Sequence, residues 1–345
     1  MWTVPKTIHR RTSIGACVSL LVLIFSIQAH AGPNITPECN SATPTGTNAT
    51  QCGEGADASG DESTAVGEDA TSTGLRGVAI GWNADAGGNF TTVVGAQANA
   101  SRNFSTAIGY QAVSTGLSST ALGAETIASG TNSTALGRQA ESTGISSTAI
   151  GAQAIASSNF STAVGQQAEV TAIRSSAFGY IAQASGVSST ALGDESIASG
   201  NQSVATGRLA LASGAGGAAF GFSADATGTN STAVGRQAEA TAINATALGA
   251  LSVASANNST ALGLQAQASA VNSTALGVQS IASGSNSTAS GRFSEATGLI
   301  ASAYGFDSEA SGVSSTALGA QSIASATNST ALGRQAEASG INSTA

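Results

Sequence analysis

The chain has 345 residues, of which 9% are charged and 4% are aromatic, and its formal net charge is −8. Its 43 glycines do not follow the Gly-X-Y period of collagen, so a collagen triple helix is excluded. An acidic chain without a basic stripe is also a poor nucleic-acid binder, so no nucleic-acid partner is expected.

Residues 1–31 are predicted to be a secretory signal peptide. The segment starts with three basic residues, continues with an apolar run from Ile14 to Ile27, and ends in small residues at Ala31. The apolar run is about 14 residues long, which is short for a membrane span. Removal of the segment would leave eight Arg against 19 acidic residues, a net charge of −11, and no Lys or His.

Residues 32–52 are predicted to form an N-terminal cap. The segment is rich in Pro, Thr, Asn and Ser, and the end of a repetitive β-structure needs a polar or covalent cap to prevent edge-to-edge growth. Cys39 and Cys52 are candidate disulfide partners, because paired cysteines in an exported protein are usually bridged. Two free thiols are the alternative.

Residues 53–345 consist of one short repeat that continues to the end of the chain. Gly recurs at every fourteenth residue from Gly53 to Gly333 without insertion or deletion, and we number positions within each repeat from this glycine as position 0. Position 7 holds a second small residue in nearly every repeat, and 14 of its 21 occurrences are Gly. This regularity predicts a solenoid. Disorder is the alternative, but disordered tracts do not keep apolar residues at fixed positions.

Each half of the repeat alternates with period two, which is the pattern of a β-strand. We therefore expect two strands of about five residues per repeat, with corners at positions 0 and 7 where Gly permits positive φ or close backbone approach. A helix is disfavoured, because two Gly per repeat would cost roughly 2 kcal/mol relative to Ala. Stacked repeats would give an all-β parallel β-roll, on the order of 100 Å long at ~4.8 Å per coil.

The side chains of position 13 are expected to point into the roll. They are mostly Leu, Ile or Val, as at Leu136, Ile150 and Val164, and they would pack against the small residues of positions 3 and 5. The Ala that recurs at position 12 would then point outward, where its constancy indicates close contact with another chain. A single thin roll also buries little apolar surface, which favours self-association.

The repeat resembles the head of YadA-like trimeric autotransporter adhesins. The resemblance is carried by Asn-Ser-Thr-Ala-Leu-Gly-x-Gln-Ala-x-Ala-Ser-Gly, found at residues 328–340 and, with two substitutions, at residues 132–144, and it covers residues 53–345. It implies a left-handed parallel β-roll, a homotrimer, and display on a Gram-negative bacterial surface. The handedness comes from the resemblance alone.

Full-length members of this family continue into a coiled-coil stalk and a C-terminal membrane barrel. Here the sequence stops at Ala345 inside a repeat, with neither heptads nor alternating aromatic strands. We interpret the chain as a C-terminally truncated head, exported to the bacterial cell surface or outer membrane. Membrane contact would come only through a C-terminal anchor absent from this chain; a secreted protein lacking an anchor is the alternative.

No enzymatic activity, cofactor or metal site is expected. The chain after the signal peptide contains no His for a catalytic triad or a histidine metal site. The acidic pairs at 61–62, 68–69 and 194–195 are interpreted as solvated turns rather than as catalytic or Ca²⁺-binding groups. Arg138, Arg236 and Arg334 each precede a Glu by three residues and could pair with it on the surface.

Aromatic residues recur at two positions of the repeat. Exposed aromatic side chains can anchor a partner, so those of position 1 are candidates for a binding surface; packing over a neighbouring coil or subunit is the alternative. Position 1 holds Trp82, Tyr110, Tyr180, Phe222 and Phe306, and position 9 holds Phe90, Phe104 and Phe160.

These patterns predict an adhesin head that attaches to extracellular-matrix or host-surface proteins, or to itself, by multivalent non-catalytic binding. The alternative is a structural or ice-binding secreted solenoid. An ice-binding face would need outward Thr at alternate residues, whereas Ser and Thr here occupy adjacent positions 10 and 11 and are expected to point to opposite faces. A secreted polysaccharide hydrolase is disfavoured by the missing catalytic groups.

Overall fold

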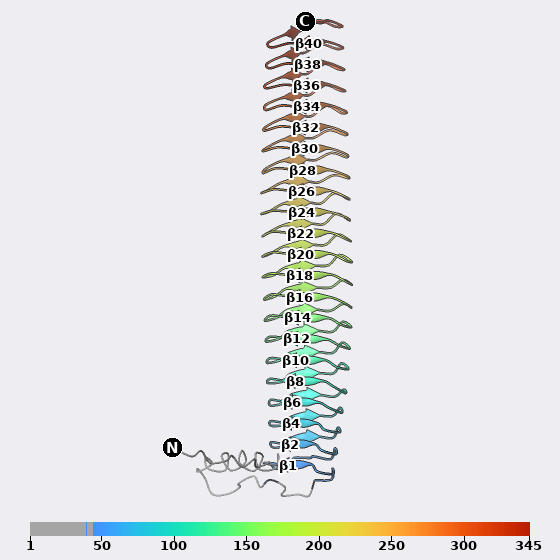
Figure 1. Ribbon diagram of the computed structural model, residues 1–345, viewed down its shortest axis with the longest axis vertical. Coiled ribbons are helices and arrows are strands. Elements are labelled where there is room, and N and C mark those ends of the chain that lie inside the picture. Colours follow the sequence, from blue (N-terminus) through green and yellow to red (C-terminus); the bar gives the residue numbers. More distant parts are fainter. Residues whose placement is uncertain (1–38, 40–43) are drawn as a thin grey trace, which may run out of the picture.

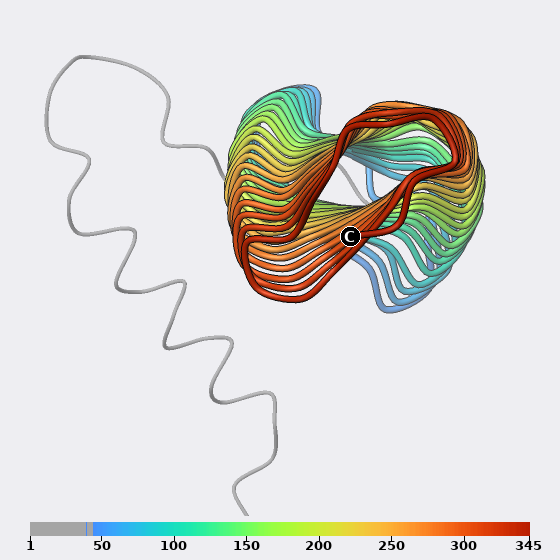
Figure 2. The same cartoon turned by 90° about the horizontal axis from the view of Figure 1, so that it is seen from above.

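A computed structural model describes Cys39 and residues 44–345. The predicted signal peptide and most of the predicted cap lie outside the described residues. The described chain forms one long rod of stacked coils, with the N-terminal coils at one end and the C-terminal coils at the other (Figure 1). Seen along the rod, each coil is rotated slightly relative to the one before it (Figure 2).

Each coil contributes one strand of three residues and one strand of two residues. Every strand pairs in parallel with the equivalent strand of the next coil, so that Thr134 lies opposite Thr148 and Glu141 opposite Ile155. The result is two ladders, which we name the long-strand sheet and the short-strand sheet. The prediction of an all-β parallel solenoid with one coil per repeat is confirmed; the left-handed winding stays an expectation from the family resemblance.

The strands of the long-strand sheet are β1 (Thr50–Cys52), β2 (Thr64–Val66), β4 (Val78–Ile80), β6 (Thr92–Val94), β8 (Thr106–Ile108), β10 (Thr120–Leu122), β12 (Thr134–Leu136), β14 (Thr148–Ile150), β16 (Thr162–Val164), β18 (Ser176–Phe178), β20 (Thr190–Leu192), β22 (Val204–Thr206), β24 (Ala218–Phe220), β26 (Thr232–Val234), β28 (Thr246–Leu248), β30 (Thr260–Leu262), β32 (Thr274–Leu276), β34 (Thr288–Ser290), β36 (Ser302–Tyr304), β38 (Thr316–Leu318) and β40 (Thr330–Leu332).

The strands of the short-strand sheet are β3 (Thr71–Ser72), β5 (Asp85–Ala86), β7 (Asn99–Ala100), β9 (Val113–Ser114), β11 (Ile127–Ala128), β13 (Glu141–Ser142), β15 (Ile155–Ala156), β17 (Glu169–Val170), β19 (Gln183–Ala184), β21 (Ile197–Ala198), β23 (Leu211–Ala212), β25 (Asp225–Ala226), β27 (Glu239–Ala240), β29 (Val253–Ala254), β31 (Gln267–Ala268), β33 (Ile281–Ala282), β35 (Glu295–Ala296), β37 (Glu309–Ala310), β39 (Ile323–Ala324) and β41 (Glu337–Ala338).

The strands are shorter than predicted, because each coil contains two turns with left-handed backbone. Residues at positions 2 and 9 adopt positive φ in nearly every coil, for example Gln139 at 58° and Ser146 at 52°. The glycines of position 0 have φ values between 125° and 145°, a region that is essentially closed to residues with a side chain. These turn residues end the strands.

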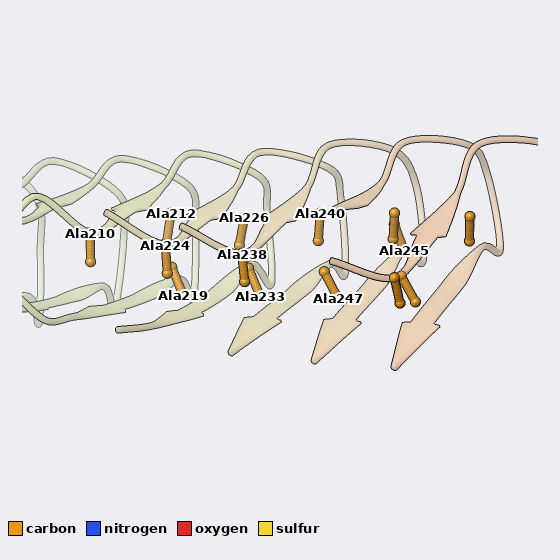
Figure 3. Packing of buried hydrophobic residues seen from close by; sticks show 14 of the residues in the cluster. Ala210, Ala212, Ala219, Ala224, Ala226, Ala233, Ala238, Ala240, Ala245 and Ala247 are labelled. Atoms are coloured by element: carbon orange, nitrogen blue, oxygen red, sulfur yellow. The ribbon is translucent and has the colours of Figure 1, made fainter. Parts of the chain in front are cut away.

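The interior of the rod lies between the two sheets and is filled by small side chains. Residues at positions 3, 5, 10 and 12 point inward, and almost all of them are Ala or Ser with no exposed surface. Figure 3 shows alanines of both sheets facing one another across this core, among them Ala226 and Ala233. The expectation that positions 3 and 5 face inward holds.

The predicted orientation of the long-strand residues is wrong. The alanines of position 12, such as Ala149, are completely buried, whereas Leu136 at position 13 is 38% exposed and points outward. Neighbouring residues of a strand face opposite sides, so an inward position 12 forces position 13 outward. The two sheets are close together, so the interior has room for the alanines of position 12 but not for a Leu or Ile from every coil.

The hydroxyls of some buried serines hydrogen-bond to carbonyl groups of the turns, whereas those of others, such as Ser63 and Ser133, make no hydrogen bond. At position 10, the hydroxyl of Ser119 donates to the carbonyl of Gly116 at 2.7 Å. At position 3, the hydroxyl of Ser196 donates to the carbonyl of Gly193 at 2.8 Å. Each bond closes one turn, so a hydroxyl can be buried where an unpaired one would cost free energy.

The N-terminal end of the rod carries a cross-link. Cys39 and Cys52 form a disulfide, and the same two residues make an antiparallel bridge at the outer edge of β1. Cys39 therefore lies beside the edge of β1 that faces away from β2. The role of a cap for residues 32–52 stays a prediction.

Replacement of Ile300 by Asn is expected to stabilise the rod by about 1 kcal/mol. Ile300 occupies position 9 with φ of 59°, and a β-branched residue is strained in this left-handed conformation, whereas Asn tolerates it. Chemical denaturation would measure the gain. Ile281→Asn is the control, because Ile281 lies in strand β33, where Asn gives no conformational relief; an equal gain from both variants would contradict the explanation.

Candidate assembly and binding surfaces

The outer face of the long-strand sheet carries two parallel columns of side chains. Position 11 supplies mainly Thr and position 13 mainly Leu, Ile or Val, and the core alanine of position 12 lies between them. We name the position 13 column the apolar ladder. Its members are Val66, Ile80, Val94, Ile108, Leu122, Leu136, Ile150, Val164, Phe178, Leu192, Thr206, Phe220, Val234, Leu248, Leu262, Leu276, Ser290, Tyr304, Leu318 and Leu332.

The apolar ladder is a long hydrophobic surface along the rod. Members such as Leu192 and Leu262 are 47% and 41% exposed, and equivalent residues stand next to each other in register through the whole sheet. A single exposed Leu is ordinary, but a long stripe of exposed apolar side chains, broken here only at Thr206 and Ser290, is typical of an interaction surface. The expectation that the position 12 alanines contact another chain is wrong, because these alanines are buried in the rod, and the outward column of position 13 is the candidate contact surface instead.

The side chains of position 11 form a single outward column of Thr. Ser133 is buried and the next residue, Thr134, faces out, as the alternation of a strand requires. The column is flanked by the apolar ladder rather than by a second row of Thr. The arrangement of two outward Thr at alternate residues, which an ice-binding face would need, does not occur on this sheet.

The five candidate aromatics of position 1 are exposed but separate. Trp82 and Tyr110 are 48% and 50% exposed, and they lie two coils apart. Phe222 lies under the guanidinium of Arg208, 5.4 Å from the ring centroid, and the ring of Phe306 meets that of Phe293 edge-on at 5.9 Å. Tyr180 and the other four line the turn that follows the apolar ladder, so they flank this ladder without forming one pocket.

Two of the position 9 aromatics pack on each other. The rings of Phe90 and Phe104 stack with 5.3 Å between centroids and 4° between planes. Arg76 extends this column, since its guanidinium lies 5.8 Å from the centroid of Phe90 and its Nε donates to Glu62 at 2.7 Å. For this pair the packing alternative is the correct one, although Phe104 keeps an open face.

The surface pairs proposed for Arg138, Arg236 and Arg334 are not formed. Within the described part of the chain the one salt bridge joins Arg76 to Glu62, from equivalent positions of adjacent coils. Arg236 instead donates to the side chain of Gln237 at 3.2 Å. Position 1 lies in a turn, whereas the Glu of position 4 lies in the short-strand sheet, so the two side chains leave the coil in different directions.

Ladders of side-chain amides were missed by the sequence analysis. Asn side chains at position 9 hydrogen-bond from coil to coil, with Nδ2 of Asn258 donating to Oδ1 of Asn272 at 3.0 Å. The unbroken ladder runs over five coils, and its signal in the sequence is Asn at the same position of consecutive repeats. Its members are Asn230, Asn244, Asn258, Asn272 and Asn286.

The acidic residues do not assemble into a catalytic or metal-binding group. The pairs at 61–62, 68–69 and 194–195 lie in turns. Across the described residues no group of three or more His, Cys, Asp or Glu is placed to hold a metal ion. A shallow depression on the short-strand sheet is lined by Leu209, Asp225 and Glu239, among others, but these two carboxylates have no basic partner there.

Replacement of Asp225 by Asn is expected to stabilise the rod at pH 7 and to have no effect at pH 3. Burial, and to a smaller extent the charge of Glu239, raise the pKa of Asp225 above its ordinary value of 3.8, while a hydrogen bond with Thr227 opposes the shift. The stability contributed by such a carboxyl is fully present below the ordinary pKa and is lost as pH rises through the raised one.

Urea midpoints at the two pH values would measure this effect. The side chain is partly exposed, so solvent screening keeps the difference small. Glu195→Gln, which removes a carboxylate from an exposed turn, is the control. A gain for Asp225→Asn that persists undiminished at pH 3 would contradict the electrostatic cause.

The family model that matches this chain is the YadA head domain repeat. The matches begin at residue 58, reach residue 345 and cover well over half of the chain. They span residues 58–84, 86–112, 114–140, 142–168, 171–196, 184–210, 212–238, 226–252, 240–266, 254–280, 268–294, 296–322, 310–336 and 324–345.

The chain belongs to the YadA head family. The resemblance inferred from the repeat sequence is thereby confirmed, and this family is one of typically non-catalytic adhesin heads. No curated protein matches the chain. In the part of the chain that the structure describes, no helix is long and apolar enough to cross a membrane.

Proposed function

We propose that the chain is the head of a bacterial trimeric autotransporter adhesin, in which three copies associate side by side along the apolar ladder. The observation that carries the proposal is the outward orientation of this ladder. Burial of a Leu side chain contributes roughly 1.5–3 kcal/mol, and the ladder offers such a residue in most coils. Three parallel copies would bury it around a common axis.

The adhesive surface is then the part of each coil that is not covered when the copies associate along the apolar ladder. It carries amide ladders and isolated aromatic side chains, and it repeats along the rod. Repetition converts contacts that are individually weak into high avidity, because each further contact forms within one complex. We propose extracellular-matrix or host-surface proteins, or other copies of the head, as partners, and the bacterial cell surface as the location.

Binding to immobilised matrix proteins would test this function. The associated protein, applied to surfaces coated with collagen, laminin or fibronectin, is expected to be retained at least about 10²-fold more strongly than a single rod. A single-rod variant is described in the Discussion. Equal retention of the two forms would contradict the avidity mechanism, and no retention on any of these surfaces or on a layer of the same protein would contradict adhesion.

A further inference from the structure

The apolar ladder has two polar members, and each directly precedes an aromatic one. Thr206 stands next to Phe220 in the register of the long-strand sheet, and Ser290 stands next to Tyr304 in the same way. We name each of these two pairs of neighbours, Thr206 with Phe220 and Ser290 with Tyr304, a step pair. All other ladder members are Val, Ile or Leu except Phe178.

The step pairs lie outside the buried core of the single rod. The rings of Phe220 and Tyr304 point outward, and each residue is 40% exposed. In an assembly built on the ladder, equivalent ladder residues of the copies form one layer per coil, and successive layers are ~4.8 Å apart. An aromatic residue fills more volume in its layer than Leu does, and the Thr or Ser of the neighbouring layer fills less. The two layers together therefore have room for the ring.

A regular ladder leaves the axial alignment of associated copies poorly defined. If one rod slides by one coil along another, Leu, Ile and Val members still meet Leu, Ile and Val members almost everywhere, as with strands of weakly specified register. After such a displacement, only the coils at the ends of the rods have no coil of the other copy beside them. Some irregularity is needed to make one alignment clearly better than the alignments one or two coils away.

We infer that the two step pairs fix the axial register of the associated copies. This inference rests on the proposed function, because it requires association along the apolar ladder. In register, three Ser290 side chains form one layer and three Tyr304 rings lie above it and extend into the space that the serines leave. The same arrangement holds for Thr206 and Phe220.

A copy displaced by one coil loses this match. Its Ser290 then lies level with Leu276 of the other copies, which leaves a gap, while its Tyr304 lies level with their serines, in space that their rings already occupy. The same interface is therefore underfilled at one level and overfilled at another, and both defects are destabilising. Each step pair thus penalises a displacement that the rest of the ladder tolerates.

A photo-crosslinking amino acid at Leu262 would report the register. Leu262 lies between the step pairs, three coils from Phe220 and two from Ser290, and peptide mapping identifies the residue captured on a neighbouring copy. In the unchanged protein the crosslinks are expected at the equivalent coil. A displacement of one coil would move them by one full repeat, to the coil of Leu248 or Leu276.

The test variant, which we name the levelled variant, removes both step pairs by the substitutions Thr206→Leu, Phe220→Leu, Ser290→Leu and Tyr304→Leu. It is expected to associate, but with at least about a tenfold rise in crosslinks displaced by one or more coils. The control makes four substitutions at regular layers and is expected to stay in register. The control substitutions are Val66→Leu, Val94→Leu, Ile108→Leu and Ile150→Leu.

A second variant moves each step pair by one coil toward the N-terminus. When it is coexpressed with unchanged chains, its residue 262 is expected to crosslink to the coil of residue 276 of an unchanged chain. The step pairs of the two chains come to the same level only if the variant is displaced by one coil. The substitutions are Leu192→Thr, Thr206→Phe, Phe220→Leu, Leu276→Ser, Ser290→Tyr and Tyr304→Leu.

The outcomes separate this inference from the proposed assembly. Association with crosslinks confined to the equivalent coil in both test variants would overturn the role of the step pairs and leave the assembly intact. If the unchanged protein sediments as a single rod, the assembly and the inference both fail. Displaced crosslinks in the levelled variant, or a shift by one coil in the mixed assembly, support the inference.

Discussion

Replacement of Leu248, Leu262 and Leu276 by Asp is expected to convert the associated protein into single rods. The three side chains point outward from consecutive coils and are partly exposed in one chain, so the fold of the rod tolerates a polar group there. In a trimer they would place nine carboxylates around a dry axis. A buried unpaired charge costs several kcal/mol, so the dissociation constant is expected to rise more than about 10³-fold.

Sedimentation at several protein concentrations would measure this change, with circular dichroism to show that the β-structure is kept. The matched control introduces the same three charges on the opposite side of the rod, by Ser255→Asp, Ser269→Asp and Ser283→Asp, whose side chains are exposed outside the short-strand sheet. The control is expected to associate normally. A triple Leu variant with the sedimentation of the unchanged protein would exclude the ladder as the interface.

Replacement of Gly277 by Ala is expected to open the rod locally, with a loss of roughly 3 kcal/mol. Gly277 occupies position 0 with φ of 143°, which a residue with a side chain avoids. An added Cβ would also lie 2.3 Å from the carbonyl oxygen of Gly291 in the next coil. Strain and the close contact act together, since parallel stacking leaves no room for the backbone to rotate.

Gly284→Ala is the matched control in the other turn of the same coil. An added Cβ there would lie 1.9 Å from the carbonyl oxygen of Gly298, but Gly284 has no positive φ. Position 7 holds Ala in five coils, so a small backbone shift suffices, and we expect a loss of at most about 1 kcal/mol. Hydrogen exchange of residues 277–298 would compare the two; equal effects would show that contact, rather than φ, decides.

The periodicity predicted the architecture because the solenoid is built from local rules that repeat. A glycine stands at position 0 in every coil because the backbone conformation there, and the close approach of the next coil, disfavour a side chain. The alternation within each half-repeat identified strands, and identical coils can only stack in parallel with equivalent residues opposite one another. The positions of the turns, the order of the strands and the two sheets therefore follow from the sequence.

The direction in which each strand faces did not follow from the sequence. Alternation divides a strand into two sets of side chains, here Ala149 on one side and Thr148 and Ile150 on the other, without stating which set is inside. The assumption that large apolar residues belong in the core gave the wrong answer. Within one rod the core admits only an occasional Val, such as Val93 or Val170, so the Leu and Ile of position 13 stay on the outside.

The candidate surfaces were anticipated in part for the same reason. Exposure of Trp82, Tyr110 and the other position 1 aromatics agrees with their place in a turn. The stacking of Phe90 on Phe104, and the amide ladder that includes Asn258, depend on contacts between equivalent residues of adjacent coils. Such contacts can be recognised in the sequence only when the repeats are aligned one above the other.

The sequence by itself determined the period, the strands and turns of each coil, and the membership of the YadA head family. The tertiary structure decided which side chains fill the interior, because the closeness of the two sheets is set by the backbone geometry of both turns together. That narrow space admits Ala and Ser and excludes Leu and Ile. The large apolar residues are consequently arranged on the outside of the rod, as a ladder.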